Sequence, residues 1–454
     1  VDNREWLEDP ARAGIVIGTV DMVGSRLLFE GYGCSRKMRP YMAGLLGVDT
    51  LFALDEAHLV PPFEALIESA VMGAETFGPR RESDRRIVPR SVVLSLSATG
   101  RGHSGEVFDL GEDDLGHPVV RQRVEAAKRV KVIAAESGAP LSDALATEAW
   151  DLADAGRIPV RCVVFCNRRE DAEQTASALA ALAGVPDAAK DEAAAADIEL
   201  LTGARRVFER SEAAARLEEL GFVAGSATMR QRPAFLVATS AGEVGVDLDA
   251  EHMVSDLVAW ERMVQRLGRV NRRGTGDAEV RVLVEPPPEK ATDEDRERSE
   301  ARLAVVRSLP GLDDGSHDGS PRGLRSLLEQ SRSDRALAER VRLATTQPPL
   351  RPALDRPTLE AWSMTALREH EGRPEVAPWL RGWEERRPQT RVVWRARLPV
   401  PEDRPPLETD LRRYFAAAPP HASEVLETET DRVVDWLAAR VKKRRKLAAK
   451  LPAD

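Results

Sequence analysis

Two adjacent carboxylates follow a short apolar run in the segment Leu51-Phe-Ala-Leu-Asp55-Glu56-Ala57-His58. The run is typical of a buried strand, and ligands bind at the carboxyl ends of strands in parallel α/β sheets. An aspartate there can hold Mg²⁺ through its water shell, and a neighbouring glutamate can deprotonate the water that attacks a γ-phosphate. We therefore expect Asp55 and Glu56 to be catalytic, with Asp55 as the metal ligand. Taken alone, the four residues could also be a chance helix start.

Small hydroxyl residues end a second β-rich run further along the chain, in Ser95-Leu-Ser-Ala-Thr-Gly100. Such side chains can hydrogen-bond the acidic strand end and respond to its state. We expect Ser97, Ala98 and Thr99 to couple the second strand to the acidic strand end. Taken alone, the segment could also be an ordinary Ser/Thr turn without a function.

Two further segments have the composition of phosphate-binding elements. Phe235–Asp247 places glycines directly after an apolar run, a pattern suited to gripping phosphate through backbone N–H groups. Gln265–Gly274 spaces Arg266, Arg269 and Arg272 three apart, so we predict a helix that carries them on one face, against a polyphosphate. An arginine of one lobe that faces a nucleotide on another stabilises transition-state charge when the lobes close. Arginine runs are also common on solvated helices.

Short β-rich runs alternate with amphipathic stretches over most of the chain, which predicts an α/β fold with parallel sheets. The predicted strands of a first lobe are Gly14 to Val20, Thr50 to Leu54 and Ser91 to Leu96. Those of a second lobe are Cys162 to Phe165, Ile198 to Leu201, Ala234 to Ala238, Asp256 to Val258 and Glu279 to Val284.

Composition shifts suggest where the domains end. The charged segment His117 to Lys131 leads into the second lobe, and the pattern becomes helical after Pro286-Pro287-Pro288. We predict a partial first lobe over 1–116, a second lobe over 117–286 and a mainly helical accessory region over 287–454. His317-Asp318 is predicted to lie in a flexible turn. The tail holds five of the eight tryptophans and should dock on the rest of the chain.

The overall composition narrows the class of protein. The chain has 454 residues, 42% of them hydrophobic and 31% charged, without a long apolar run, so we expect a cytoplasmic protein with no membrane partner. A net charge of −9 argues against coating nucleic acid by bulk charge, but a few local arginines can still hold a strand.

Taken in order, these segments resemble motifs II, III, V and VI of superfamily 2 helicases of the DEAH-box kind, which have two RecA-like lobes. Gly18-Thr-Val-Asp21 looks like motif Ib, Phe165-Cys-Asn167 like motif IV, and Leu201–Arg206 like an additional strand-binding element. The resemblance implies ATP and Mg²⁺ as cofactors, and catalytic roles for Arg269 and Arg272 beside the two carboxylates. It implies nucleotide contacts for His58, Gly242, Asp247, Gln265 and Arg266.

The same resemblance implies contacts with the backbone of single-stranded DNA, for Thr19, Thr202, Arg206 and Thr239. Arg205 could take the place of Arg206. Each threonine could instead be an ordinary strand residue or helix cap.

Finer resemblance lies between the motifs, in Gly18–Met22, Leu28–Pro40 and Asp256–Arg273. These segments look like the CRISPR-associated helicase–nuclease of type I interference, and Ala361–Thr365 and Arg373–Trp383 look like its subtype G (formerly U) branch. The resemblance implies a motor that an RNA-guided surveillance complex recruits to an R-loop, and that unwinds target DNA with ATP in antiviral defence. An HD nuclease, fused or separate, would cut the DNA; only seven scattered histidines occur here, so we expect that nuclease outside this chain.

Other classes of function share these motor motifs. A DNA repair or restriction helicase, or a DEAH-box RNA helicase, would carry them too. The sequence contains no Gly-x-x-x-x-Gly-Lys-Ser/Thr and begins at Val1, so we expect an N-terminal truncation that leaves the chain inactive alone.

Overall fold

The computed structural model describes residues 5–9, 12–79, 81–97, 106–136, 138–184, 196–203, 205–226, 228–368, 370–383, 387–395 and 404–448. The chain divides into two compact units. Unit 1 comprises Val1–Val107 with Gln347–Arg386, and unit 2 comprises Phe108–Thr346 with Arg387–Asp454. Within the described ranges, no helix has the length and apolarity needed to cross a membrane.

Unit 1 is built around two parallel strands, β1 (Leu51–Leu54) and β2 (Val92–Ser95), which pair from Leu51 opposite Val92. Helix α4 (Pro61–Met72) begins with two prolines. Proline is accepted in the first turn of a helix because the N–H that it lacks would have no partner within the helix. The described helices that complete the first part of this unit are α1 (Glu5–Glu8), α2 (Val20–Leu27), α3 (Arg39–Gly47), η1 (Ala57–Leu59), α5 (Ala74–Phe77) and α6 (Glu82–Ile87).

The predicted strand over 14–20 is wrong. Residues 13–19 pair with no strand, and α2 begins at Val20, with Thr19 as its N-cap. The alternating apolar side chains that suggested a strand, Ile15 and Ile17, are each 92% exposed. The apolar residues alternate as in a strand, but no described part of the structure packs on the side chains of Ile15 and Ile17.

Tryptophans from the tail complete the core of unit 1. Helix α16 (Arg356–Ser363) buries Trp362, and α17 (Ala377–Arg381) brings Trp379 to within 4.9 Å of it, edge to face. The pair packs with Phe63 and Ile67 of α4. Docking of this part of the tail was predicted, but residues 347–386 fold with unit 1 and do not belong to a separate accessory region.

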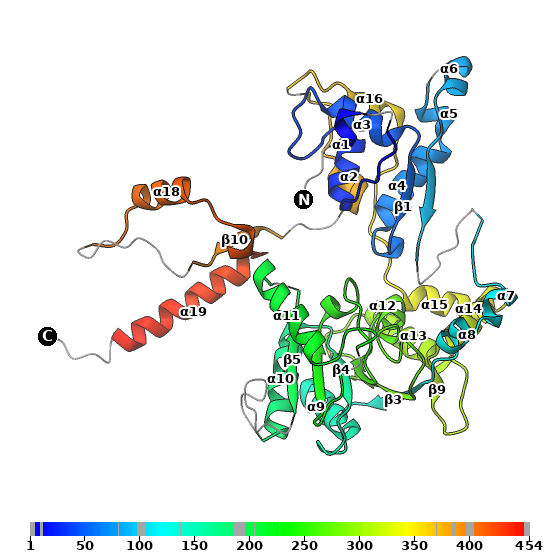
Figure 1. The fold of residues 1–454 in the computed structure, drawn as a ribbon, viewed down its shortest axis with the longest axis vertical. Helices are drawn as coiled ribbons and strands as arrows, with labels where there is room; N and C mark the ends of the chain where they lie inside the picture. Colours follow the sequence, from blue (N-terminus) through cyan, green and yellow to red (C-terminus); the bar gives the residue numbers. More distant parts are fainter. Residues whose placement is uncertain are drawn as a thin grey trace. The chain divides into compact units, whose positions relative to one another are not determined.

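Unit 2 holds a seven-stranded sheet in the order β5-β6-β4-β7-β8-β3-β9. Figure 1 labels β5, β4, β3 and β9 of this sheet. All neighbouring pairs are parallel except β3 with β9. The strands are β3 (Lys128–Ala134), β4 (Arg161–Phe165), β5 (Asp197–Leu201), β6 (Ala234–Ala238), β7 (His252–Asp256), β8 (Ala278–Val284) and β9 (His317–Asp318).

Both faces of this sheet are covered by helices, as parallel sheets require. Cys162 and Val164 of β4 pack in a core with α9 (Leu141–Leu152) and α10 (Arg169–Leu182). The alternate residues Val163 and Phe165 pack in a second core. Its helices are α11 (Val207–Glu219), α12 (Trp260–Leu267), α13 (Asp293–Arg307), α14 (Pro321–Ser333) and α15 (Arg335–Ala344).

The sheet differs from the prediction in three places. Strand β3 lies in the segment expected to be a charged connection, and β9 replaces the turn expected at His317-Asp318. Strand β7 ends at Asp256, where a strand was predicted to begin. The helices up to Ala344 pack on the sheet, so unit 2 extends well past the boundary predicted at residue 286.

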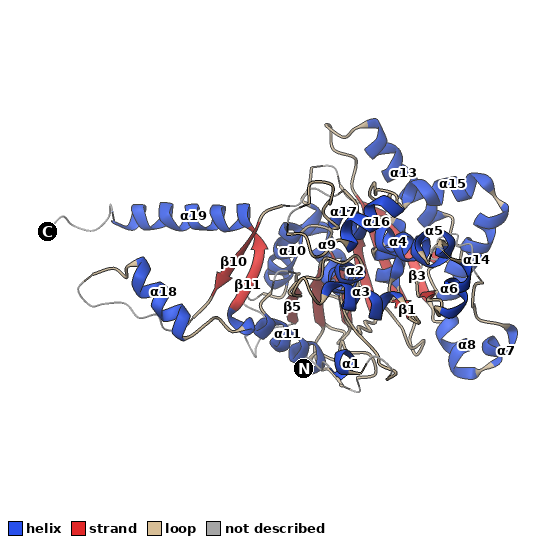
Figure 2. Ribbon diagram, turned by 90° about the horizontal axis from the view of Figure 1, so that it is seen from above, coloured by secondary structure: helices blue, strands red, loops and turns tan. Residues whose placement is uncertain are grey.

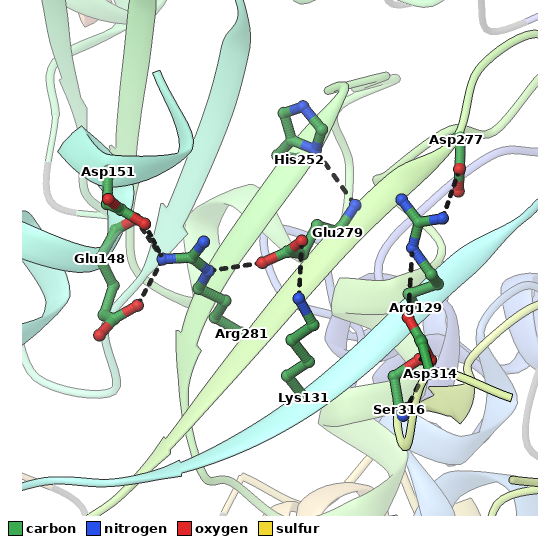
Figure 3. Close-up of polar contacts among 10 residues, drawn as sticks. All are labelled: Arg129, Lys131, Glu148, Asp151, His252, Asp277, Glu279, Arg281, Asp314 and Ser316. Carbon is green, nitrogen blue, oxygen red and sulfur yellow. Dashed lines mark hydrogen bonds and ion pairs between the residues drawn. The ribbon is translucent and has the colours of Figure 1, made fainter. Parts of the chain in front are cut away.

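Charged side chains can occupy β3 and β8 because they pair with one another (Figure 3). Glu279 accepts from Lys131 Nζ at 3.0 Å and from Arg281 Nε at 2.7 Å. Arg281 also donates to Glu148 and Asp151 of α9, so the network ties that helix to the sheet.

The rest of unit 2 contains an antiparallel hairpin and a long helix. Strands β10 (Gln389–Val393) and β11 (Val425–Glu429) pair, and α19 (Thr430–Ala448) follows β11 directly (Figure 2). The other described elements are α7 (Glu112–Gly116), α8 (Pro118–Val124), η2 (Ser240–Gly242), α18 (Glu408–Ala417) and η3 (Ala422–Glu424). The α/β class with a mainly helical C-terminal region is confirmed, and the hairpin is an addition to it.

Candidate functional site

The two predicted catalytic carboxylates lie directly after β1. Asp55 is exposed, and Glu56 is half-buried with φ 49° and ψ 45°. That left-handed conformation is uncommon for a residue with a β-carbon, and such strain persists where the surrounding structure imposes it. Here the turn is held by the bond from Ala57 N–H to the carbonyl of Leu96, 3.0 Å. The carboxyl ends of both strands are thereby joined.

His58 and Ser97 meet at this joined strand end. The histidine is buried, and its Nδ1 lies 3.2 Å from the Ser97 hydroxyl and 3.4 Å from Glu56 Oε2. The structure therefore brings the candidate coupling residue Ser97 into contact with the acidic motif through His58. Ala98 and Thr99, the other two coupling candidates, lie outside the described residues.

A groove of about 1150 Å³ in unit 1 contains two of the candidates together. Thr19 and Asp55 both line it, along with residues of β1 and of the extended segment 13–19. The Thr19 hydroxyl caps α2 by accepting from Met22 N–H at 3.4 Å. Thr19 is therefore a helix cap, one of the alternatives considered for it. Its side chain is also exposed and lines the groove.

In unit 2, Thr202 and Thr239 follow the neighbouring strands β5 and β6. The strands pair in register from Asp197 opposite Ala234 to Leu201 opposite Ala238, and Thr239 N–H donates to the Leu201 carbonyl at 3.1 Å. The two threonines therefore lie side by side at one edge of the sheet, although both side chains are largely buried.

A buried ionic network lies at the same edge. Glu243 accepts from Arg262 and Arg266, each at 2.8 Å, and Arg266 also donates to Asp256 at 2.5 Å. The guanidinium of Arg266 packs over the ring of Phe165. Burial alone would raise the pKa of Glu243, but the two arginines outweigh it and hold that pKa below its ordinary value.

This network changes the interpretation of Arg266. Its side chain is fully buried, so it has no surface to offer a nucleotide in this structure. Gln265 is also buried. Sequence reasoning missed the partners Glu243 and Asp256 because they come from other elements than α12, and no spacing along the chain relates them to Arg266. Arg262 lies one turn before Arg266 on α12 and shares Glu243 with it.

Gly242 also differs from its predicted environment. Its N–H donates to the Thr239 carbonyl at 2.9 Å, and an added Cβ would come within 2.9 Å of Ala238 Cβ. The glycine is needed because η2 packs closely on β6. Its N–H is therefore engaged within the protein and is not directed at a phosphate.

The predicted arginine helix ends early. Helix α12 stops at Leu267, so Arg269 and Arg272 lie in the following segment, residues 268–276, which we name the arginine loop. Arg269 Nε donates to the backbone carbonyl of Glu243 at 2.8 Å, and Arg272 forms an ion pair with Asp247. Both members of the second pair are about half exposed, so a charged ligand can reach them.

Two residues that sequence reasoning did not single out hold the arginine loop. Asn271, at φ 42°, donates through Nδ2 to the carbonyls of Ala127 (3.0 Å) and Gly276 (2.7 Å). Lys128 is buried, and its Nζ donates to the carbonyl of Leu267 at 2.7 Å. Burial lowers the pKa of Lys128 from 10.5 to about 8. Lys128 is the first residue of β3, the strand that was not predicted, and Ala127 directly precedes it.

Arg206 is the N-cap of α11, four residues after Thr202 in the chain. Its guanidinium pairs with Glu209 at 2.8 Å and lies over the ring of Trp394, 5.7 Å from the ring centroid. Arg205 pairs with Glu199 at 3.5 Å. The aromatic contact brings the segment after β10 to the candidate strand-binding element.

The fit of a magnesium ion rests on Asp55. No group of three or more His, Cys, Asp or Glu side chains in the described ranges could hold a metal by itself. Mg²⁺ keeps most of its waters and is commonly bound by one or two carboxylates together with substrate phosphates. An exposed aspartate at the end of a strand fits that mode.

One protein family matches part of the chain. Residues 160–275 match the family described as CRISPR-associated nuclease/helicase Cas3, C-terminal. No curated protein matches the sequence.

Several solved structures match the chain at low sequence identity. Cas3 of T. fusca with ATP is 17% identical, with a TM-score of 0.50 over 86% of this chain and 48% of that one. A chain of a CRISPR RNA-guided surveillance complex, pre-nicking, is 18% identical (TM-score 0.46, 75% of this chain, 44% of that one). The DUF1998 helicase MrfA bound to DNA and AMPPNP is 16% identical (TM-score 0.40, 70% and 39%).

The chain spans about half the length of the T. fusca protein. The likeness to that structure confirms the predicted architecture of RecA-like lobes. The family match contains Thr202, Thr239, Arg269 and Arg272. Residues 160–275 are therefore similar to the C-terminal part of the CRISPR-associated nuclease/helicase Cas3, within a chain whose fold is like that of T. fusca Cas3.

Proposed function

We propose that the chain is the motor of a CRISPR-associated helicase of the Cas3 type, which uses ATP to move along single-stranded DNA. The observation that carries the proposal is the family match over residues 160–275. The acidic strand end in unit 1 supports it, because the contact of Glu56 with His58, and of His58 with Ser97, links the candidate base to the second strand.

In this proposal Glu56 orients and deprotonates the water that attacks the γ-phosphate. Asp55 holds Mg²⁺, which when bound neutralises charge on the phosphates. His58, Asp247 and Gln265 belong to the nucleotide site, and Ser97, Ala98 and Thr99 couple it to the DNA. The DNA backbone is contacted by Thr19, Thr202, Arg206 and Thr239.

Arg269 and Arg272 supply positive charge to the transition state in this proposal. Their guanidinium groups now bond to the Glu243 carbonyl and to Asp247. Each must therefore exchange its present acceptor for a phosphate oxygen, which makes hydrolysis depend on a change within unit 2.

The biological setting is also proposed. Recruitment by an RNA-guided surveillance complex to an R-loop would load the motor on the displaced strand, and an HD nuclease, fused or separate, would cut the DNA. Because the sequence contains no Gly-x-x-x-x-Gly-Lys-Ser/Thr, we propose that this stretch alone does not hydrolyse ATP. Subtype G remains the specific assignment within the family.

Glu56→Gln tests the chemical role. In the complete protein, ATP binding should persist while the steady-state hydrolysis rate falls by about 10²-fold or more, because the attacking water loses its base. A phosphate-release assay with single-stranded DNA measures the rate, and equilibrium binding of a fluorescent ATP analogue measures affinity.

Glu82→Gln provides the matched control. It makes the same carboxylate-to-amide change at an exposed residue of α6, whose ion pair with Arg86 lies on the surface of the same helix. Hydrolysis should be unchanged. If Glu56→Gln also hydrolyses ATP at the normal rate, Glu56 is not the base.

A further inference from the structure

Four side chains form a continuous ladder of cations and aromatic rings in unit 2: Arg206, Trp394, Trp436 and Arg440. The Arg206 guanidinium lies 5.7 Å from the Trp394 centroid, and the two indole rings are 5.8 Å apart, edge to face. The Arg440 guanidinium lies 4.2 Å from the centroid of Trp436. The ladder joins the start of α11 to the hairpin and to α19.

The tryptophans of the ladder remain accessible. Trp394 is 42% exposed and Trp436 is 41% exposed, unlike the buried Trp362 and Trp379 of unit 1. Large aromatic rings usually bury most of their surface, because that surface is apolar. An arginine lies over each ring, and the exposed remainder of the two indoles is apolar surface that a base can contact.

Positive charge continues from the ladder along α19. From Trp436 to the end of the helix there is no acidic residue, whereas Arg440, Lys442, Lys443, Arg444 and Arg445 are all exposed. The chain as a whole has a net charge of −9, so this concentration is local. It complements a polyanion.

We infer that the ladder and the basic half of α19 form a binding surface for single-stranded nucleic acid, which lies outside the helicase motifs except at Arg206. Proteins hold single strands by stacking unpaired bases on aromatic rings while basic side chains follow the phosphates. The ladder supplies the rings, and α19 supplies the charge. The surface begins at Arg206, so it extends the proposed strand path beyond the motor motifs. This inference deepens the proposed function and rests on it only for the identity of the strand as DNA.

The test measures binding of a fluorescent oligo-dT to the 454-residue chain without nucleotide, by anisotropy. Trp394→Ala combined with Trp436→Ala should weaken binding at least about fivefold, because stacking on an aromatic ring contributes that much per base. An abasic oligonucleotide of the same length carries the same phosphates but no bases, and its binding should not change. Trp394→Phe with Trp436→Phe keeps both rings and should bind oligo-dT nearly as the wild type does.

Trp383→Ala is the control for losing an exposed tryptophan, because Trp383 is 62% exposed in unit 1 and lies outside the ladder. It should bind oligo-dT normally. Thermal unfolding of all variants reports whether the ladder merely attaches the hairpin. If the alanine variant binds oligo-dT as tightly as the wild type, or loses oligo-dT and the abasic strand equally, the stacking surface does not exist.

The basic helix is tested by changing Lys442, Lys443, Arg444 and Arg445 together to glutamine. Affinity should depend less steeply on salt, with the slope of log K against log salt falling by about 0.7 for each phosphate that the helix no longer binds. Glutamines at the exposed residues Arg86, Arg157, Lys290 and Arg322 remove the same charge elsewhere and should leave the slope unchanged. Equal slopes for the two quadruple variants would overturn the inference.

These results are independent of the ATPase. If Glu56→Gln still hydrolyses ATP but oligo-dT binding needs the two tryptophans, the catalytic assignment fails and the binding surface stands. If Glu56→Gln abolishes hydrolysis but replacing the two tryptophans leaves oligo-dT binding unchanged, the catalytic assignment stands and the binding surface does not exist.

Discussion

At the scale of single residues, Arg266 shows that an arginine in a phosphate-binding motif can instead form a buried structural ion pair. Its position among regularly spaced arginines indicates a phosphate ligand, yet in the structure its guanidinium is enclosed by Glu243, Asp256 and Phe165. A fully buried cation with two carboxylate partners holds elements together. In the proposed mechanism, contact with the phosphates therefore falls to the exposed Arg272 and the half-buried Arg269.

Replacing Arg266 by alanine should therefore lower the free energy of unfolding of unit 2 by about 3–5 kcal/mol, because Asp256 loses its arginine and Glu243 keeps only Arg262. Arg266→Lys should recover only part of this loss, since an ammonium cannot reproduce the forked geometry. Urea titration followed by circular dichroism measures both.

Arg157→Ala is the comparison, since that side chain is 73% exposed and pairs with Asp154 on the surface. It should cost less than about 1 kcal/mol. A loss of similar size for both arginines would contradict the structural role of Arg266.

At the scale of elements, four strands of unit 2 could be predicted closely and β3 could not. Strands β4 and β6 contain apolar runs, and the apolar residues of β5 and β8 are interrupted by only one charged residue at a time, so all four were predicted within one residue of their bounds. Strand β3 was missed because Lys128, Arg129 and Lys131 are typical of a solvated connection. Their partners, such as Glu279 of β8, become neighbours only when the sheet forms.

Part of the candidate site could also be predicted from the sequence, and part of it could not. The acidic strand end and the two threonines could be placed from sequence, because each follows an apolar run and parallel strands bring their carboxyl ends to one edge. The arginine loop could not, because its shape depends on Asn271 in the left-handed region and on bonds to the start of β3. Helical spacing therefore predicted a common face that does not form.

The junction between β3 and the end of α12 should make stability depend on pH. Lys128 has a pKa of about 8 when folded and an ordinary value of 10.5, so between these values the unfolded chain holds a proton that the folded chain has released. Stability should rise with pH across this window, by up to about 1.4 kcal/mol per pH unit, and the added stability should disappear below about pH 8.

Lys128→Met removes this titration. The difference in unfolding free energy between the wild type and the variant, from urea titrations between about pH 7 and pH 10, should increase in favour of the wild type above about pH 8. A difference that stays constant over that range would show that the lysine titrates normally.

At the scale of the whole molecule, unit 1 is assembled from two distant stretches of chain. Trp362 is 1% exposed and packs on Trp379 and on α4. Trp362→Ala should therefore destabilise unit 1 by about 3–5 kcal/mol, as large cavities do. Hydrogen exchange followed by mass spectrometry should show faster exchange in peptides covering β1 and α4.

Peptides from β4, β6 and β7 of unit 2 should exchange at their normal rates in this variant, because their core shares no residue with the tryptophan pair. Trp383→Ala should leave both units unchanged. Faster exchange throughout the chain would mean that the two units unfold together.

The interrupted path of unit 1 also has a consequence for how the protein is made. A ribosome adds roughly 5–20 residues per second, so the synthesis of Phe108–Thr346 separates the two parts of unit 1 by some tens of seconds. During that time Phe63, Ile67 and the rest of the first part lack the tryptophans that cover them. The nascent chain therefore presents an incomplete apolar core while the sheet of unit 2 emerges, and a chaperone that shields residues 51–72 would have its greatest effect in that interval.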